Sequence, residues 1–145
     1  MPDVTVREAE SADAPQIMDL IRELAISNGE ASPVNESYVE EFLSFPGCGV
    51  LVAEEDGEIV GLLSYSVRPN LYHGGDAALI EELVVSGRAR SKGIGSALLR
   101  EMISLADALG CVEIAVSTLP GNENAQRFYE RHGLVDEAIL LEKHF

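Results

Sequence analysis

The sequence predicts a mixed α/β fold, with a sheet that begins antiparallel and has one crossover connection through a long helix. Two neighbouring β-rich runs, at 49–53 and 58–67, are close enough to form a hairpin, and a third run follows at 77–85. Apolar residues then recur at helical spacing over 94–109. A further β-rich run at 112–117 follows that helix, so the helix is expected to connect two strands of one sheet.

The N-terminal segment is expected to form a short strand at 4–7 and then two helices. Asp13 stands where it can cap the first helix, and Gln16 occupies the capping-box position three residues later. The expected buried face of this helix consists of Ile17, Leu20, Ile21 and Leu24. Asn28-Gly29 ends the helix, and a weaker second helix is expected at about 36–44.

The central and C-terminal elements follow from turn residues and hydrophobicity. Asp56-Gly57 favours the positive φ values of a tight hairpin turn between the first two runs. The run at 77–85 is almost continuously apolar, which indicates a central strand. A short helix is expected at 122–132 and a final strand at about 138–144. Because no repeat, low-complexity tract or linker is present, residues 1–145 are expected to be a single domain.

Composition excludes several classes of protein. The formal net charge is −15, which disfavours general binding to nucleic acid or to anionic membranes. No apolar run approaches the ~18 residues that a transmembrane helix needs. The N-terminus has neither a basic leader nor an apolar signal core, so a cytoplasmic location is expected. Three scattered histidines and no Cys/His cluster predict that there is no metal site.

Positive charge is concentrated at one place in this acidic chain. Arg88, Arg90 and Lys92 precede a turn that contains Gly93 and Gly95, and the long helix begins there. Unpaired amides in the first turn of a helix bind anions, and glycine lets a phosphate approach the backbone closely. The composition of this segment is equally consistent with a solvated turn whose glycines allow tight packing. Neither a Walker A loop nor the GxGxxG fingerprint matches it.

A longer pattern includes this turn. Residues 90–95 read RSKGIG, which fits R/Q-x-x-G-x-G/A, with IEELVV before it and NENAQRFYERHGL after it. In this order the segments resemble the acetyl-CoA loop, central strand and C-terminal signature of the GNAT superfamily of N-acetyltransferases. The resemblance is specific over 79–134. It implies a three-layer fold, with a mostly antiparallel sheet of about six to seven strands flanked by four helices. Ser91 departs from the glycine that members often have.

The resemblance implies direct transfer of an acetyl group from acetyl-CoA to a primary amine. The residues that it implies for cofactor binding are Leu83, Val84, Val85, Arg90, Ser91, Lys92, Gly93, Ile94, Gly95, Ser96, Asn122 and Ala125. The family's tyrosine matches Tyr129, which is then the general acid that protonates the departing thiolate. The other interpretation of Tyr129 is an amphipathic core residue that has no part in the chemistry.

Two glutamates on the central strand are the candidates for the base. Glu81 matches the position that serves as base, often through water, in several amine-acetylating relatives. Consecutive strand residues point to opposite faces, so only one of Glu81 and Glu82 is expected to face the cleft. Desolvation in an apolar strand raises the pKa of a carboxylate, which suits a base. Alternatively, Glu81 has only a structural role in a salt bridge. An ordered water could then serve as the base in place of either glutamate.

The acceptor is the least specified part of the prediction. The resemblance implies a site built from about 24–45 and 68–75. Acidic side chains there can attract a cation, and two ring side chains can line a pocket; these residues are Glu30, Glu36, Glu40, Tyr72 and His73. The alternative interpretation, which is favoured for each of them, is a solvated surface group. The acceptor is a small-molecule amine or a protein amino group. Members of the family are often homodimers.

Two other functions remain as alternatives. One is a non-catalytic sensor or regulatory domain that binds acyl-CoA without transferring the acyl group. The other is a nucleotide-binding regulatory domain. An intact loop together with Tyr129 favours the enzyme.

Overall fold

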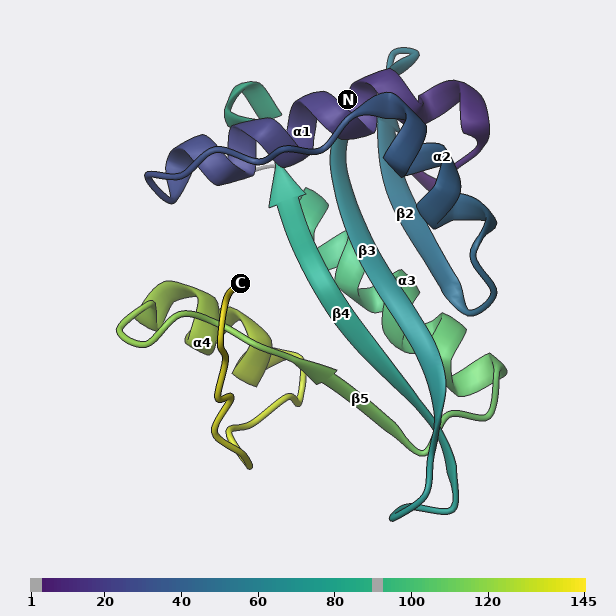
Figure 1. Ribbon diagram of the computed structural model, residues 1–145, viewed down its shortest axis with the longest axis vertical. Helices are drawn as coiled ribbons and strands as arrows, with labels where there is room; N and C mark the ends of the chain where they lie inside the picture. Colours follow the sequence, from purple (N-terminus) through teal and green to yellow (C-terminus); the bar gives the residue numbers. More distant parts are fainter. Residues whose placement is uncertain (1–3, 90–92) are drawn as a thin grey trace.

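Five strands and four α-helices make up the regular structure of the part of the chain that the computed structural model describes, residues 4–89 and 93–145 (Figure 1). In chain order the elements are β1 (Val4–Glu8), α1 (Ala14–Ser27), α2 (Glu36–Ser44), β2 (Cys48–Glu55), β3 (Glu58–Asn70), β4 (Gly75–Val85), α3 (Ile94–Ala108), β5 (Glu113–Val116) and α4 (Glu123–Arg131). Two short 3-10 turns, at Ser11–Asp13 and Gly87–Ala89, precede α1 and α3.

The strands form one sheet in the order β1-β2-β3-β4-β5. The first four are antiparallel neighbours, and β5 is parallel to β4 because α3 connects the two. The predicted mixed sheet and its crossover are therefore confirmed. The strand count is lower than the six to seven expected, since the predicted strand at 138–144 has no regular structure. Ile139 and Leu141 are largely exposed there, and β-favouring side chains form a strand only when a neighbouring strand pairs with them.

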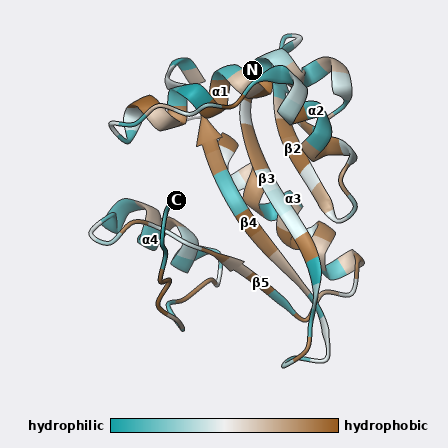
Figure 2. Cartoon of the chain, viewed as in Figure 1, coloured by the Kyte–Doolittle hydropathy of each residue, from teal (hydrophilic) through white to brown (hydrophobic). Residues whose placement is uncertain are grey.

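The sheet lies between two helical layers, with α1 and α2 over one face and α3 over the other (Figure 1). Leu62 packs with Ile17 on the first face, whereas its neighbour Leu63 packs with Leu98 on the second. Because both faces are covered, every residue of β3 from Ile59 to Tyr65 is buried. Figure 2 shows the resulting hydrophobic strands, with a hydrophilic band within β4.

The hairpin turn forms as its sequence predicts. Asp56 and Gly57 have φ values of 51° and 79°, the left-handed conformation that a tight turn between β2 and β3 requires. The helix α3 buries Ile94 and Met102 as expected. Leu109, which was expected on the same face, lies beyond the last helical residue and is 53% exposed.

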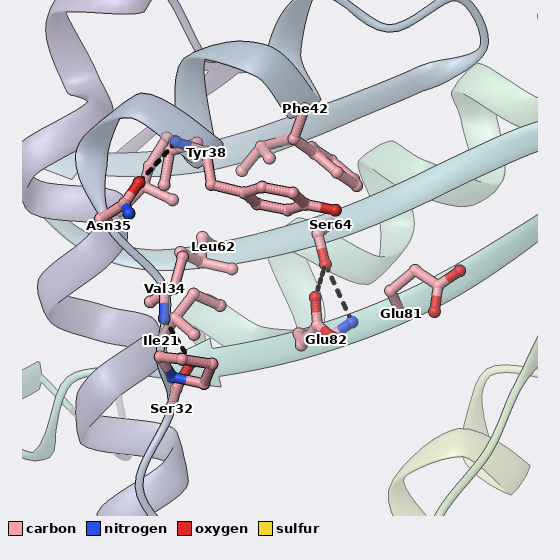
Figure 3. Close-up of a pocket in the computed structure, with 14 residues that line it drawn as sticks. Ile21, Ser32, Val34, Asn35, Tyr38, Phe42, Leu62, Ser64, Glu81 and Glu82 are labelled. Atoms are coloured by element: carbon pink, nitrogen blue, oxygen red, sulfur yellow. Dashed lines mark hydrogen bonds between the residues drawn. The ribbon is translucent and has the colours of Figure 1, made fainter. Parts of the chain in front are cut away.

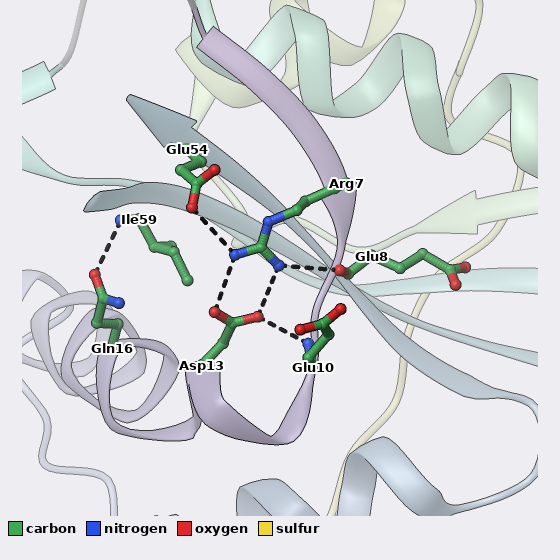
Figure 4. Close-up of polar contacts among 7 residues, drawn as sticks. All are labelled: Arg7, Glu8, Glu10, Asp13, Gln16, Glu54 and Ile59. Atoms are coloured by element: carbon green, nitrogen blue, oxygen red, sulfur yellow. Dashed lines mark hydrogen bonds and ion pairs between the residues drawn. The ribbon is translucent and has the colours of Figure 1, made fainter. Parts of the chain in front are cut away.

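A charged network ties β1 to the start of α1 (Figure 4). The Arg7 guanidinium donates to both carboxylate oxygens of Asp13, at 2.8 and 3.0 Å, and to Glu54 Oε1 at 3.3 Å. Asp13 also accepts the backbone N–H of Glu10 at 2.8 Å. These hydrogen bonds, with that from Arg7 the strongest, hold the pKa of Asp13 below its usual value.

This network corrects the capping prediction. Asp13 does precede α1, but its carboxylate caps no amide of that helix because Arg7 and Glu10 hold it. Gln16 does not complete a capping box either. Its Oε1 accepts the backbone N–H of Ile59 at 2.9 Å, so this side chain joins α1 to the sheet. No helix in the described part of the chain has the length and hydrophobicity of a membrane-spanning segment.

Candidate active site

The strands β4 and β5, the last two of the sheet, diverge beyond a short paired segment. Their parallel pairing runs from Ala77 and Glu113 to Ile80 and Val116, and β4 then continues to Val85 (Figure 1). The amide of Ser86 donates to Val60 O in β3 at 2.8 Å, so strand alternation turns the N–H and C=O of Leu83 away from β3. A strand edge in this position can pair with a peptide-like ligand.

A β-bulge lies at the start of the diverging segment. Ser64 pairs with Glu82, but the next residue, Tyr65, pairs with Ile80, which leaves Glu81 as the extra residue of β4. A bulge breaks the strict alternation of side chains between the two faces. The expectation that only one of Glu81 and Glu82 faces the cleft is therefore wrong, because both line the same pocket.

The pocket has a volume of about 460 Å³ and opens between α1, α2 and the sheet (Figure 3). Its lining consists of Ile17, Ile21, Ser32, Pro33, Val34, Asn35, Tyr38, Val39, Phe42, Val50, Leu62, Ser64, Glu81 and Glu82. The first two helices and their connection thus contribute as expected. Of the described lining residues, none comes from the expected 68–75 segment, where Tyr72 and His73 are exposed. Glu30, Glu36 and Glu40 do not line the pocket either.

The two glutamates differ in environment. Burial raises the pKa of Glu82, and the charge of Glu81 raises it further, while the hydrogen bond from the Ser64 hydroxyl acts in the opposite direction. Ser64 Oγ also accepts the Glu82 amide at 3.0 Å, which fixes the side chain against β3. Glu81 is exposed, and Ser66 Oγ lies 3.5 Å from its Oε1. The desolvation expected for Glu81 therefore falls on Glu82.

Tyr129 lies on the other side of the sheet. It is 9% exposed and packs in the core cluster that contains α3, with its ring edge-on to Phe128 at 5.2 Å. Burial raises the pKa of its hydroxyl, so the protonated form persists to higher pH. The hydroxyl has no hydrogen-bond partner among the described residues, although buried tyrosines usually have one.

The start of α4 presents the other two expected contacts. Asn122 precedes the helix and its Oδ1 accepts the Ala125 amide at 3.2 Å. This bond gives Asn122 a capping role and fixes the direction of its amide group. Ala125 is partly buried against the same core cluster as Tyr129.

The glycine turn is described only from Gly93 onward; Arg90, Ser91 and Lys92 lie outside the described residues. Gly93 has a φ of 75° and would have open space around an added Cβ. The first amides of α3 lack intrahelical partners, which is the arrangement that the predicted anion site requires; binding of an anion there stays a prediction. Ser96 Oγ lies 3.2 Å from His132 Nε2, which joins this turn to the end of α4. His132 was not anticipated from the sequence; its place just after the NENAQRFYER helix was the only signal.

The comparison with known families is consistent with this geometry. A model described as "Acetyltransferase (GNAT) family" matches residues 14–134. The chain belongs to the GNAT family. Similar proteins include an aminoalkylphosphonate N-acetyltransferase of Salmonella typhimurium, 30% identical over 92% of this chain and 86% of that protein. An L-amino acid N-acetyltransferase of Escherichia coli is 29% identical over 92% of this chain and 83% of that protein.

A solved structure resembles this GNAT protein over almost its whole length. The structure of a transcriptional regulator from Bacillus halodurans has a TM-score of 0.88 and 32% identity, and covers 99% of this chain and 100% of its own. The described residues contain no group of three or more His, Cys, Asp or Glu side chains that could hold a metal ion.

Proposed function

We propose that this GNAT protein is an N-acetyltransferase that moves an acetyl group from acetyl-CoA to a primary amine by direct attack. The observation that carries the proposal is the position of the glutamates. Glu81 and Glu82 follow directly after Ile80, the last residue of β4 that pairs with β5, and both line the largely apolar pocket between α1, α2 and the sheet. This position next to the diverging strands supports a role for the carboxylates in preparing an acceptor bound in the pocket.

The residues around the divergence fit the donor. The backbone of Leu83 faces away from β3 and can pair with the amides of the pantetheine arm, as expected for the Leu83–Val85 segment. The α3 N-terminus at Gly93 can hold the diphosphate, with Arg90 and Lys92 adjacent in sequence. Acetyl-CoA, when bound, supplies an acetyl group activated as a thioester.

The two carboxylates prepare the acceptor. An ammonium has no lone pair, so Glu81 or Glu82 must take a proton from the amine, directly or through a water. Glu82 has the raised pKa that improves a carboxylate as a base, whereas Glu81 has the greater access to solvent. The negative charge of Glu81 adds a smaller contribution to the raised pKa of Glu82 than burial does.

Tyr129 completes the proton balance. The amine nitrogen forms a bond to the acetyl carbon while the carbon–sulfur bond breaks, and Tyr129 donates its proton to the leaving sulfur. The first proton, removed from the ammonium before attack, remains on the carboxylate or passes to solvent. The nitrogen loses a second proton once it is bonded to the acetyl carbon, and this proton restores the neutral form of Tyr129, directly or through water. The absence of a hydrogen-bond partner for this hydroxyl among the described residues supports the role, as does its raised pKa.

The relatives support the general reaction and leave one alternative. Two are named N-acetyltransferases of amines, an aminoalkylphosphonate and L-amino acids. The Bacillus halodurans protein is named a transcriptional regulator, which supports a non-catalytic acyl-CoA sensor as the second candidate. A net charge of −15 makes direct contact with DNA unfavourable for this chain.

A turnover screen separates the two candidates. Thiol release from acetyl-CoA is measured across a panel of amines, with mass spectrometry of the acetylated product and calorimetry of CoA binding. The enzyme predicts amine-dependent thiol release. CoA binding without turnover of any amine supports the sensor, and thermal protection by ATP or NAD but not by CoA supports a nucleotide-binding domain.

A further inference from the structure

The acceptor pocket has one acidic side and a largely apolar lining elsewhere, with Ser32, Asn35 and Ser64 as its uncharged polar members. In Figure 3, Glu81 and Glu82 lie at one side, and Ile21 and Val34 lie at the other. Between these sides the aromatic rings of Tyr38 and Phe42 contribute from α2. An occupant that fits has a cationic end next to the carboxylates and an apolar body against the opposite side.

The charges of the lining are all negative. Glu81 and Glu82 are its only charged members, and no Lys, Arg or His appears among the described residues that line the pocket. A carboxylate or phosphonate on the acceptor would enter a largely apolar space in which no described lining residue carries a positive charge, near two carboxylates of like sign. Both effects disfavour binding, because a buried anion needs a partner and like charges repel.

One described arginine lies near the pocket but is already engaged. Arg22, on α1, donates from Nη2 to the Val34 carbonyl at 3.1 Å and does not line the pocket. Its guanidinium holds the loop between α1 and α2 from the outside. Arg22 is therefore the residue to test if an acidic group is nevertheless recognised at the rim.

We propose that the acceptor is a small primary amine with an aliphatic or aromatic body and no acidic group. This inference rests on the proposed function and narrows its substrate. The volume of about 460 Å³ suits one small molecule. The acceptors named for the two relatives, an aminoalkylphosphonate and L-amino acids, carry an acidic group as well as the amine, and the described lining of this pocket offers that group no positive charge.

Matched pairs of amines test the inference. Each pair differs mainly by an acidic group: phenethylamine and phenylalanine, 3-methylbutylamine and leucine, propylamine and 3-aminopropylphosphonate. The values of kcat/KM from thiol release should favour the member without the acid by about tenfold or more in each pair, the difference that about 1.4 kcal/mol of differential binding gives. Equal or higher values for the acidic members would overturn the inference.

Two variants and a control identify the cause of the preference. Val34→Lys places a cation on the side of the pocket opposite the glutamates. It should weaken the preference for amines without an acidic group, by raising kcat/KM for phenylalanine relative to phenethylamine. Ala31→Lys adds the same charge at an exposed position of the same loop that does not line the pocket, and should leave the ratio unchanged. Arg22→Gln should also leave the ratio unchanged; a wider preference in this variant would show that Arg22 recognises an acid and would contradict the proposal.

The outcomes separate this inference from the function on which it rests. Acetylation of the acidic members alone overturns the inference and leaves the acetyltransferase intact. Absence of thiol release with every amine, despite CoA binding, overturns the acetyltransferase and the inference with it. If Val34→Lys does not fold, the ratios measured with the unmodified chain still decide.

Discussion

Replacement of Ser64 by alanine tests the role of Glu82 without altering either carboxylate. The Ser64 hydroxyl donates to the Glu82 carboxylate and accepts the Glu82 amide at 3.0 Å. Ser64 is only 4% exposed, so water does not easily replace these bonds. Ser64→Ala therefore removes the one interaction that favours the charged form of Glu82 against burial.

The size of the effect follows from the type of bond. A hydrogen bond to a charged group contributes about 1.5–3 kcal/mol, so the charged form of Glu82 should lose roughly this much stabilisation. The pKa of Glu82, already raised by burial, then rises further. Because the carboxylate loses its charge as pH falls through this pKa, the acidic limb of kcat/KM should move to higher pH.

The assay is the pH dependence of kcat/KM between about pH 5 and pH 9, with the best amine of the screen. Ser66→Ala is the matched control, since Ser66 lies on the same face of β3 and contacts Glu81 only at 3.5 Å. A shifted limb in Ser64→Ala alone identifies Glu82 as the titrating base. Superimposable profiles of Ser64→Ala and the unmodified protein would refute this reasoning and favour Glu81 or water.

Three further predictions concern the proton donor, the diphosphate site and the β1–α1 network. Tyr129→Phe should lower kcat by about 10² with little change in CoA affinity by calorimetry, since only the proton donor is lost; an unchanged kcat would return Tyr129 to a packing role. Gly93→Glu should weaken CoA binding at least about tenfold, because it brings negative charge and a strained positive φ to the α3 N-terminus. Gly29→Glu has the same φ of 75° and open surroundings, and should leave CoA affinity unchanged; equal affinities in both variants would contradict the site. Asp13→Asn should destabilise the fold by about 1–3 kcal/mol near pH 7 in urea unfolding, because Arg7 loses a charged partner. The pKa of Asp13 is lower in the folded than in the unfolded protein, so its carboxylate stabilises the fold fully above the unfolded pKa of about 3.9, and this stabilisation is lost as pH falls through the folded pKa. The difference in unfolding free energy between Asp13→Asn and the unmodified protein should therefore shrink near pH 3. A difference that stays constant with pH would argue against this role of the Asp13 charge.

The elements that could be predicted are those whose signals are local. The helix at 36–44 was predicted at the bounds observed for α2, and the Asp56-Gly57 turn formed as expected. The final strand at 138–144 was wrong because its side chains favour a strand but depend on a partner strand that local sequence does not reveal. Similarly, Asp13 has the composition of a cap, and only the fold shows that Arg7 engages it.

The candidate site was predictable in its residue types but not in its geometry. The glutamates were identified, yet the bulge at Glu81 has no glycine or proline to signal it, so alternation was assumed where it fails. Tyr38 and Phe42 were missed as pocket residues because they are spaced like ordinary members of an amphipathic helix. The loop with Tyr72 and His73 was included in the expected site together with 24–45, but none of the described lining residues comes from it.

The position of the two helical layers has a consequence for kinetics. The acceptor pocket opens on the α1–α2 face, whereas Tyr129 and the start of α3 belong to the opposite face. With the donor held on the α3–α4 side, as proposed, the two substrates arrive by separate routes and neither obstructs the other. Initial-rate plots should therefore intersect, as for any ternary complex, and inhibition by each product should show that either substrate can bind first and either product can depart first.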